Sequence, residues 1–323
     1  MSHEFRSNGK FMLTGEYLVL KGSTALALPL KLGQSMNVDT LDSDENRIYW
    51  KAFKSSTYKN QQTTDIVQKQ ESWFSVVLNK SDFDIIETDD KEKAERLSNI
   101  LSQAKSLNEN LFNDSYDYRF STLLDFDPQW GLGSSSTLIN NVSEWANINP
   151  YLLLDSTFKG SGYDIACAKA DGPIFYQVNK QQATDNRLIS TASFNPEFKD
   201  NLYFIYQGHK QNSANEVKSF LDNDKDYSSE VESISEISKI IPHINTLRDF
   251  CYFIKVHEEI MESCLSRKRI KKHFSDFEGE MKSLGAWGGD FFLAATEWEE
   301  QQVKDFFKNK GLDVTIKYKD IVL

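Results

Sequence analysis

The sequence predicts a two-domain α+β protein, and three observations support this fold class. Short apolar segments rich in β-branched and aromatic residues, bounded by turn residues, predict strands in the N-terminal part of the chain. Longer segments with apolar residues at helical spacing predict helices, most clearly over residues 91–112. Around residues 181–196 the chain becomes polar and loses its periodicity. We therefore expect one domain over residues 1–182 and a second over residues 183–323.

The first predicted domain begins with strands and continues with helices. Apolar and β-branched residues predict strands, which are expected over residues 11–20, 24–30, 35–41 and 47–53. The polar residues 54–64 predict a loop. The helix over residues 91–112 has one apolar face, formed by Ala94, Leu97, Leu101, Ala104 and Leu111. Asn149 and Pro150 predict the start of another helix, and Gly172-Pro173 precedes a strand over residues 174–178.

The second predicted domain alternates strands with helices in a βααβαβ-like order. Strands are expected over residues 202–206, 291–295 and 314–318. Helices are expected over residues 215–221, 229–241, 247–265 and 297–308. Neither domain contains an internal repeat.

Composition limits the classes of partner. The 323 residues carry a net charge of -11, which argues against nucleic acid or an anionic membrane as a partner. No apolar run approaches the ~18 residues of a membrane span, and the start lacks the apolar core of a signal peptide. Cys167, Cys251 and Cys264 lack paired metal spacing and are expected to be reduced thiols. The sequence therefore predicts a cytoplasmic protein, either a monomer or a homodimer.

One glycine-serine segment is especially informative about function. It reads Gly131-Leu132-Gly133-Ser134-Ser135-Ser136 and runs directly into a helical pattern. Glycines tolerate positive φ, and a helix start presents N–H groups to an anion. The segment alone is consistent with a nucleotide-phosphate site or with an ordinary glycine loop capped by serine. It matches neither the Rossmann fingerprint nor the Walker pattern.

Three further segments accompany this loop. Residues 9–22 contain Lys10 and the sequence Gly15-Glu16-Tyr17, and residues 160–166 contain Gly162 and Asp164. The third reads Gly285-Ala286-Trp287-Gly288-Gly289-Asp290. In this order the four segments resemble the motifs of the GHMP small-molecule kinases. The resemblance implies a two-domain fold, with a ribosomal-protein-like βαβ topology in the N-terminal domain and a ferredoxin-like C-terminal domain.

The resemblance also implies roles for residues of these motifs. Asp164 is expected to be the catalytic base, with Lys10 directed at it and at the transferred phosphoryl group. The alternative for Asp164 is a helix cap. ATP is expected on residues 131–136 and on Gly285, Ala286, Gly288 and Gly289, with Mg²⁺ at Ser135. Asp155 stands in the region where mevalonate kinases carry a metal-binding glutamate, but a solvent-facing side chain is the preferred interpretation.

The acceptor side is assigned to a different set of residues. The resemblance places the acceptor substrate at Glu16, Tyr17, Gly162, Lys210 and Ser213. Glu16 and Tyr17 are also consistent with a structural role, and Lys282 is a further candidate cation. Trp287 departs from the usual glycine of the third motif. Because tryptophan takes positive φ at a cost, either the loop bends differently or the indole lies over the site.

Three details favour the phosphomevalonate branch over the mevalonate branch: Gly-Glu-Tyr in the first motif, Gly-Ser-Gly-Tyr-Asp at residues 160–164, and Asp290. The sequence therefore predicts ATP-dependent phosphorylation of a small soluble metabolite. The alternatives are a catalytically silent relative that binds a nucleotide or metabolite as a regulator, and a sugar or amino-acid kinase of the same superfamily.

Overall fold

The computed structural model describes residues 3–59, 66–158, 160–178, 187–209, 213–223, 225–285, 287 and 289–323. The chain forms two compact units, each assembled from separate segments. The first contains Met1–Gly9, Leu32–Pro128 and Leu132–Lys169, and the second contains Lys10–Lys31, Gln129–Gly131 and Ala170–Leu323. The long strands β1 (His3–Thr14) and β2 (Ala25–Leu41) contribute residues to both units. The predicted division at residue 182 remains a prediction.

The first unit contains a mixed sheet with the strand order β5-β4-β3-β6-β2. Its remaining strands are β3 (Arg47–Lys59), β4 (Ile66–Asn79), β5 (Ile85–Thr88) and β6 (Asp117–Leu124). β3 runs parallel to β6, whereas β3–β4, β4–β5 and β2–β6 are antiparallel pairs. A parallel pair requires a crossover connection, and the crossover between β3 and β6 includes a helix.

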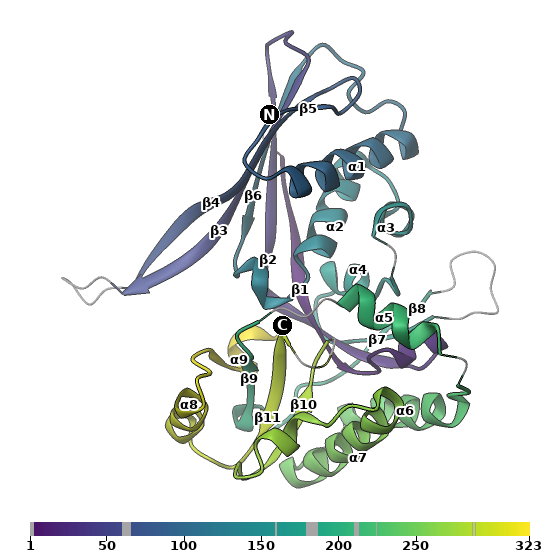
Figure 1. The fold of residues 1–323 in the computed structure, drawn as a ribbon, viewed down its shortest axis with the longest axis vertical. Helices are drawn as coiled ribbons and strands as arrows, with labels where there is room; N and C mark the ends of the chain where they lie inside the picture. The colour runs from purple at the N-terminus through teal and green to yellow at the C-terminus, as the bar shows by residue number, and fades with distance from the viewer. Residues whose placement is uncertain are drawn as a thin grey trace. The chain divides into compact units, whose positions relative to one another are not determined.

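Helices cover one face of this sheet (Figure 1). They are α1 (Lys91–Leu107), α2 (Ser134–Ala146), α3 (Pro150–Thr157) and the short α4 (Tyr163–Ala168). The apolar face of α1 packs against inward side chains of β3 and β6, where the rings of Trp50 and Phe120 stack at 4.7 Å. α2 packs against α3 and α4. The core of the first unit thereby supports the start of α2, where the glycine-serine loop ends.

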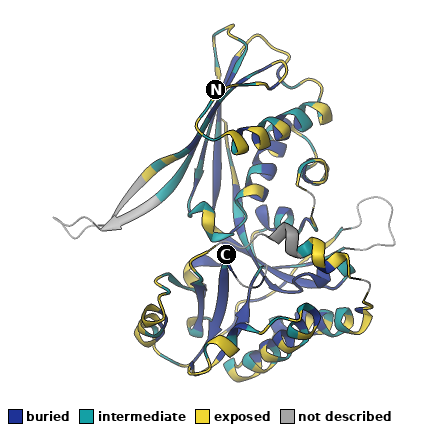
Figure 2. Cartoon of the chain, viewed as in Figure 1, coloured by how far each residue is buried: buried dark blue, intermediate teal, exposed yellow. Residues whose placement is uncertain are grey.

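The second unit contains a four-stranded antiparallel sheet in the order β10-β11-β9-β12. The strands are β9 (Leu202–Tyr206), β10 (Glu280–Ser283), β11 (Phe291–Ala295) and β12 (Thr315–Lys317). Numbered by their appearance in this sheet, they follow the order 2-3-1-4, which is that of a ferredoxin-like split βαβ arrangement. Figure 2 shows β11 buried along its whole length. In the same unit β7 (Ile174–Val178) pairs with Ala25–Ala27 of β2 and with β8 (Arg187–Thr191).

The helices of the second unit flank these strands. They are α5 (Ser213–Leu221), α6 (Ser228–Ile240), α7 (Leu247–Leu265), α8 (Glu300–Asn309) and α9 (Tyr318–Ile321). α7 packs against both β10 and α6. Thr246 caps α7 by accepting a hydrogen bond from the Asp249 N–H group.

The predicted helix over residues 247–265 and the strands over residues 174–178, 202–206 and 291–295 are confirmed. The expected strand over residues 11–20 is wrong beyond Thr14, because Gly15 adopts positive φ and the 3-10 helix η1 (Leu18–Lys21) follows. The loop predicted from residue 54 is also wrong, since β3 continues to Lys59 by pairing with β4. Ladder hydrogen bonds of a long hairpin override the polar composition there.

Two negative expectations can be compared with the described part of the chain. Within it, no helix is both long and apolar enough to cross a bilayer. The three cysteines are free thiols, and Cys167 and Cys264 are buried.

Candidate functional site

The glycine-serine loop has the backbone that its sequence predicts. Gly131 and Gly133 adopt φ of 70° and 99°, which is the left-handed region that glycine tolerates. Gly133 is the N-cap of α2, and no side chain caps this helix start. The first N–H groups of an α-helix have no intrahelical partner and attract anions. The loop therefore ends at a helix start with the geometry of an anion site.

The three serines of this loop have different environments. Ser136 is 3 % exposed, and its hydroxyl donates a 2.8 Å hydrogen bond to the carbonyl oxygen of Gly133. Ser134 is half-buried and Ser135 is exposed. Ser136 thus stabilises the loop from inside, whereas the exposed hydroxyl of Ser135 is accessible to a ligand.

Parts of three sequence motifs come together in the second unit. The ammonium group of Lys10 donates a 3.2 Å hydrogen bond to the carbonyl oxygen of Gly131. A Cβ atom on Gly131 would lie only 2.5 Å from the Asp290 carboxyl carbon, so the Asp290 side chain packs directly against this glycine. A Cβ on Gly285, which has φ of 65°, would lie 3.4 Å from the same carboxylate. The first, second and third motifs are therefore neighbours in space, although up to 280 residues separate Lys10 (residue 10) from Asp290 (residue 290).

The third motif accommodates its tryptophan in an unusual way. Trp287 itself adopts a positive φ of 48°, which costs a non-glycine residue about 1–2 kcal/mol. Its indole is only 2 % exposed, and its Nε1 atom has no hydrogen-bond partner among the described residues. Its carbonyl oxygen accepts a 3.1 Å hydrogen bond from Arg267. The loop thus keeps a left-handed bend and buries the indole. Ala286 and Gly288 lie outside the described residues, whereas Gly289 accepts a 2.7 Å hydrogen bond from Gln207.

Asp164 lies in the first turn of α4. The N-cap of this helix is Gly162, with φ of 86° and no side-chain cap bond, so Asp164 is not the N-cap residue. Asp164 is half-buried, and one of its carboxylate oxygens accepts a 3.2 Å hydrogen bond from the N–H group of Ile165. A Cβ on Gly160 would meet open space. Asp164 belongs to the first unit and Lys10 to the second, and their pairing remains a prediction.

The segment after β1 enters a rare three-residue turn over residues 16–18, and residues Gly15–Tyr17 are together called the Gly15–Tyr17 turn. Tyr17 has φ of 59° and ψ of -50°, and the Leu18 N–H group donates a 2.6 Å hydrogen bond to the carbonyl oxygen of Glu16. Positive φ, negative ψ and an i→i+2 hydrogen bond define a classic γ-turn, which is strained. Tyr17 is 7 % exposed, and its ring lies 5.3 Å from that of Phe220. The turn is thus held inside the second unit.

Buried charged side chains surround this turn. Glu16 is 2 % exposed, while Lys282 of β10 and both His257 and Glu258 of α7 are fully buried. Lys282 donates a short hydrogen bond to the Glu16 carboxylate and lies 3.5 Å from that of Glu258. Lys282 therefore contacts carboxylates inside the protein, where we had considered it as a cation for the acceptor. These contacts support the structural alternative for Glu16.

Burial shifts the proton affinities in this cluster. It raises the pKa of Glu258 to about 8, although the Lys282 ammonium opposes the shift. Burial also raises the pKa of Glu16, again against the effect of Lys282. The pKa of His257 is well below its ordinary value, because burial and the nearby Lys282 both disfavour the imidazolium. His257 is therefore neutral at physiological pH.

The remaining predicted residues are placed as follows. Asp155 is exposed on α3, in agreement with the solvent-facing interpretation. Lys210 lies outside the described residues, and Ser213 is the first residue of α5. Sequence reasoning did not identify His257 and Glu258 as functional candidates. Their spacing from Phe250, Ile254 and Met261 places them on the apolar face of a helix, which is the signal that would have marked them as buried charges.

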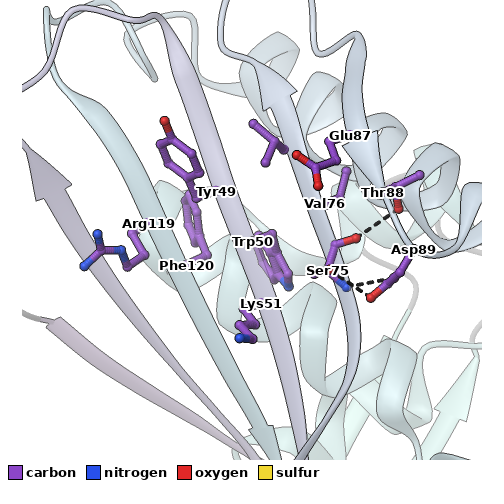
Figure 3. A pocket seen from close by; sticks show the side chains of 11 residues that line it. Tyr49, Trp50, Lys51, Ser75, Val76, Glu87, Thr88, Asp89, Arg119 and Phe120 are labelled. Atoms are coloured by element: carbon purple, nitrogen blue, oxygen red, sulfur yellow. Dashed lines mark hydrogen bonds between the residues drawn. The ribbon is translucent and has the colours of Figure 1, made fainter.

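A separate cavity of about 370 Å³ lies in the first unit, among β3, β4, β5 and β6. Figure 3 shows Trp50 and Phe120 among its lining side chains, with Ser75 bonded to Asp89. None of the residues predicted for nucleotide or acceptor binding line this cavity.

Comparisons with known proteins give matches among solved structures alone, since no family model and no curated protein matches the chain. The chain is similar to the Lin0012 protein of Listeria innocua, with 17% identity, a TM-score of 0.67 and coverage of 98% of this chain and 97% of that one. Streptococcus pneumoniae phosphomevalonate kinase in complex with phosphomevalonate and AMPPNP gives 15% identity, a TM-score of 0.66 and coverage of 98% and 99%. Methanococcus jannaschii mevalonate kinase is 15% identical, with a TM-score of 0.65 and coverage of 98% of this chain and 97% of that one.

Nearly complete coverage of both chains decides the fold. The chain has the GHMP kinase fold. The resemblance seen in four short motifs therefore extends over the whole chain at the level of architecture. At 15–17% identity the likeness concerns fold, and activity must be argued from the site.

Proposed function

We propose that this GHMP-fold protein is a phosphotransferase that moves the γ-phosphoryl group of ATP to a small soluble metabolite, with phosphomevalonate as the favoured acceptor. The observation that carries the proposal is the hydrogen bond from Lys10 to Gly131 beside the Asp290 carboxylate. It joins a cation to the first glycine of the nucleotide loop. Phosphoryl transfer requires such positioned positive charge more than covalent chemistry.

In the proposed reaction, a hydroxyl or phosphate oxygen of the acceptor forms a bond to the γ-phosphorus. The bond from that phosphorus to the β,γ-bridging oxygen breaks, and ADP leaves with the electron pair. Asp164 orients the attacking oxygen and takes its proton where it carries one. Lys10 offsets the charge on the moving phosphoryl group.

The donor set fits Mg²⁺ with the nucleotide. Mg²⁺ is typically held by few protein oxygen ligands together with substrate phosphates. The exposed hydroxyl of Ser135 and the carboxylate of Asp164 offer oxygen of this kind. When bound, the ion would neutralise phosphate charge.

The choice of a phosphorylated acceptor depends on the sequence of the motifs and on likeness to a phosphomevalonate kinase. Gly162 and Lys210 remain the proposed acceptor contacts, together with Ser213. We also keep the cytoplasmic location and the monomeric or homodimeric state as predictions.

The test is a panel of acceptors in an assay coupled to ADP release. We expect the rate with phosphomevalonate to exceed the rates with mevalonate, homoserine and galactose, and Lys210→Ala to weaken the first selectively. A higher rate with mevalonate would overturn the choice of acceptor and leave the kinase proposal standing.

The buried Trp287 in place of a glycine favours a second candidate, a silent regulator that binds nucleotide without turnover. MgATP that raises the melting temperature by linkage, with no ADP release on any acceptor of the panel, would favour that candidate.

A further inference from the structure

The end of β1 is followed by a turn that cannot be stable by itself. The γ-turn at Tyr17 has a backbone conformation that costs about 1–3 kcal/mol, and such conformations persist where surrounding groups determine them. The same strand carries Lys10, whose ammonium contacts Gly131. The turn therefore lies at the end of the strand that carries this lysine.

His257 of α7 holds the first residue of the turn. The Gly15 N–H group donates a 3.3 Å hydrogen bond to Nε2 of His257, so this nitrogen is the acceptor of a neutral ring and Nδ1 carries the proton. Nδ1 faces the Glu258 carboxyl at 3.9 Å. Nε2 lies 3.5 Å from Oε2 of Glu16, and that oxygen is buried without a hydrogen-bond partner among the described residues.

Lys282 of β10 holds the second residue of the turn. Its ammonium binds Oε1 of Glu16 and donates a 2.9 Å hydrogen bond to the carbonyl oxygen of Ser283. Glu258 completes the connection, because its Oε2 accepts a 3.1 Å hydrogen bond from the Ser283 N–H group. The third residue, Tyr17, packs on Phe220. Each residue of the turn thus has its own anchor.

The helix α6 also packs next to this turn, against η1. Thr14, just before the turn, shares a 2.7 Å hydrogen bond with Ser238 of α6. The buried titratable groups of this cluster are Glu16, His257, Glu258 and Lys282. His257 is neutral, and Glu258 retains its proton below its pKa of about 8. Ionisation of Glu258 adds a buried negative charge, which competes with Glu16 for Lys282.

We propose that His257, Glu258 and Lys282 are positioning residues, which fix the Gly15–Tyr17 turn and through it the placement of Lys10 against Gly131. The inference depends on the proposed kinase function for its kinetic consequence. Amide hydrogen exchange at the turn tests the positioning independently of the kinase activity.

The first experiment uses Lys282→Met in the full chain. Glu259→Gln is the control, because Glu259 is exposed on α7, the helix that carries His257 and Glu258. With phosphomevalonate as acceptor, we expect Lys282→Met to lower kcat by about tenfold or more and to change the KM for MgATP by less than about twofold. Amide hydrogen exchange should accelerate in the peptide that contains Gly15 to Leu18. The control should match the wild type in both measurements.

The second experiment uses Glu258→Gln, which has nearly the same shape and imitates the protonated carboxyl. At neutral pH we expect the kcat of this variant to equal the kcat of the wild type. At a pH of about 9, ionisation of Glu258 should lower the kcat of the wild type, whereas the kcat of the variant should stay unchanged. This variant decides the question if Lys282→Met does not fold.

Two results would overturn the inference. One is a folded Lys282→Met protein with unchanged kcat and unchanged exchange at the turn. The other is an alkaline loss of activity in Glu258→Gln equal to that of the wild type. A wild-type protein that phosphorylates no acceptor would refute the proposed function instead, and the exchange measurement would still test the positioning.

Discussion

The glycine-serine loop and the Gly15–Tyr17 turn are both predicted kinase motifs, but the structure uses their side chains in opposite ways. In the loop, Ser135 is exposed at a helix start. In the turn, the side chains of Glu16 and Tyr17 are buried and contact other parts of the second unit. A motif residue can therefore supply chemistry or hold the backbone that does so, and burial distinguishes the two.

The largest effect on activity is expected at Asp164, the predicted catalytic base. Asp164→Asn should lower kcat by about 10²-fold or more, because a carboxamide cannot accept the proton. The KM for MgATP should change little, and the control Asp155→Asn, exposed on α3, should behave as the wild type. Nearly normal kcat in Asp164→Asn would return this residue to a structural role.

The next effect concerns the contact between Gly131 and Asp290. Gly131→Ala should lower the free energy of unfolding by about 1–3 kcal/mol, because alanine is strained at this φ and its Cβ would displace the Asp290 carboxylate. The rise in melting temperature caused by MgATP should also shrink. Gly172→Ala is the control, since a Cβ there meets open space. Equal melting curves for the two variants would contradict the packing described for Gly131.

A pH series separates the buried cluster from the loop. The pKa of Glu258 is raised on folding from about 4.5 to about 8. The contribution of protonated Glu258 to the free energy of unfolding is therefore complete below a pH of about 4.5 and is lost as the pH rises through about 8. As the pH rises from about 6 to about 8, the free energy of unfolding of the wild type should therefore fall by about 2 kcal/mol relative to that of Glu258→Gln. Parallel denaturation profiles would show that Glu258 does not titrate in this way.

The smallest effect distinguishes two neighbouring serines. Ser136→Ala should lower the free energy of unfolding by about 1 kcal/mol, because it removes the hydrogen bond to the Gly133 carbonyl. Ser135→Ala should leave stability unchanged and reduce the melting shift with MgATP. A stability loss at Ser135 instead of Ser136 would reverse the roles assigned to these serines.

The sequence was informative where local chemistry decides the structure. Gly131 and Gly133 predicted a left-handed loop before α2, and the apolar spacing along residues 247–265 predicted α7 with its exact bounds. The sequence was less informative where pairing with a distant strand decides the structure. The polar residues from Lys54 to Lys59 form a strand because β4 provides the partner, and no local pattern reveals that partner.

The candidate site shows the same limit. Lys10 and Asp290 were predicted as motif residues, but their convergence on Gly131 depends on tertiary contacts. Lys282 was considered as an acceptor cation, because a phosphorylated acceptor next to the ATP phosphates requires additional positive charge. Its burial follows from the packing of α7 against β10, which brings Glu258 to it.

The buried indole of Trp287 also has an optical consequence. A buried indole, with no hydrogen bond to its N–H group among the described residues, should emit at shorter wavelengths than one in water. The chain has six tryptophans, so the difference between the emission spectra of the wild type and Trp287→Phe isolates this one. Because Trp287 lies in the loop proposed to meet the nucleotide, its emission would report the arrival of ATP without any added dye.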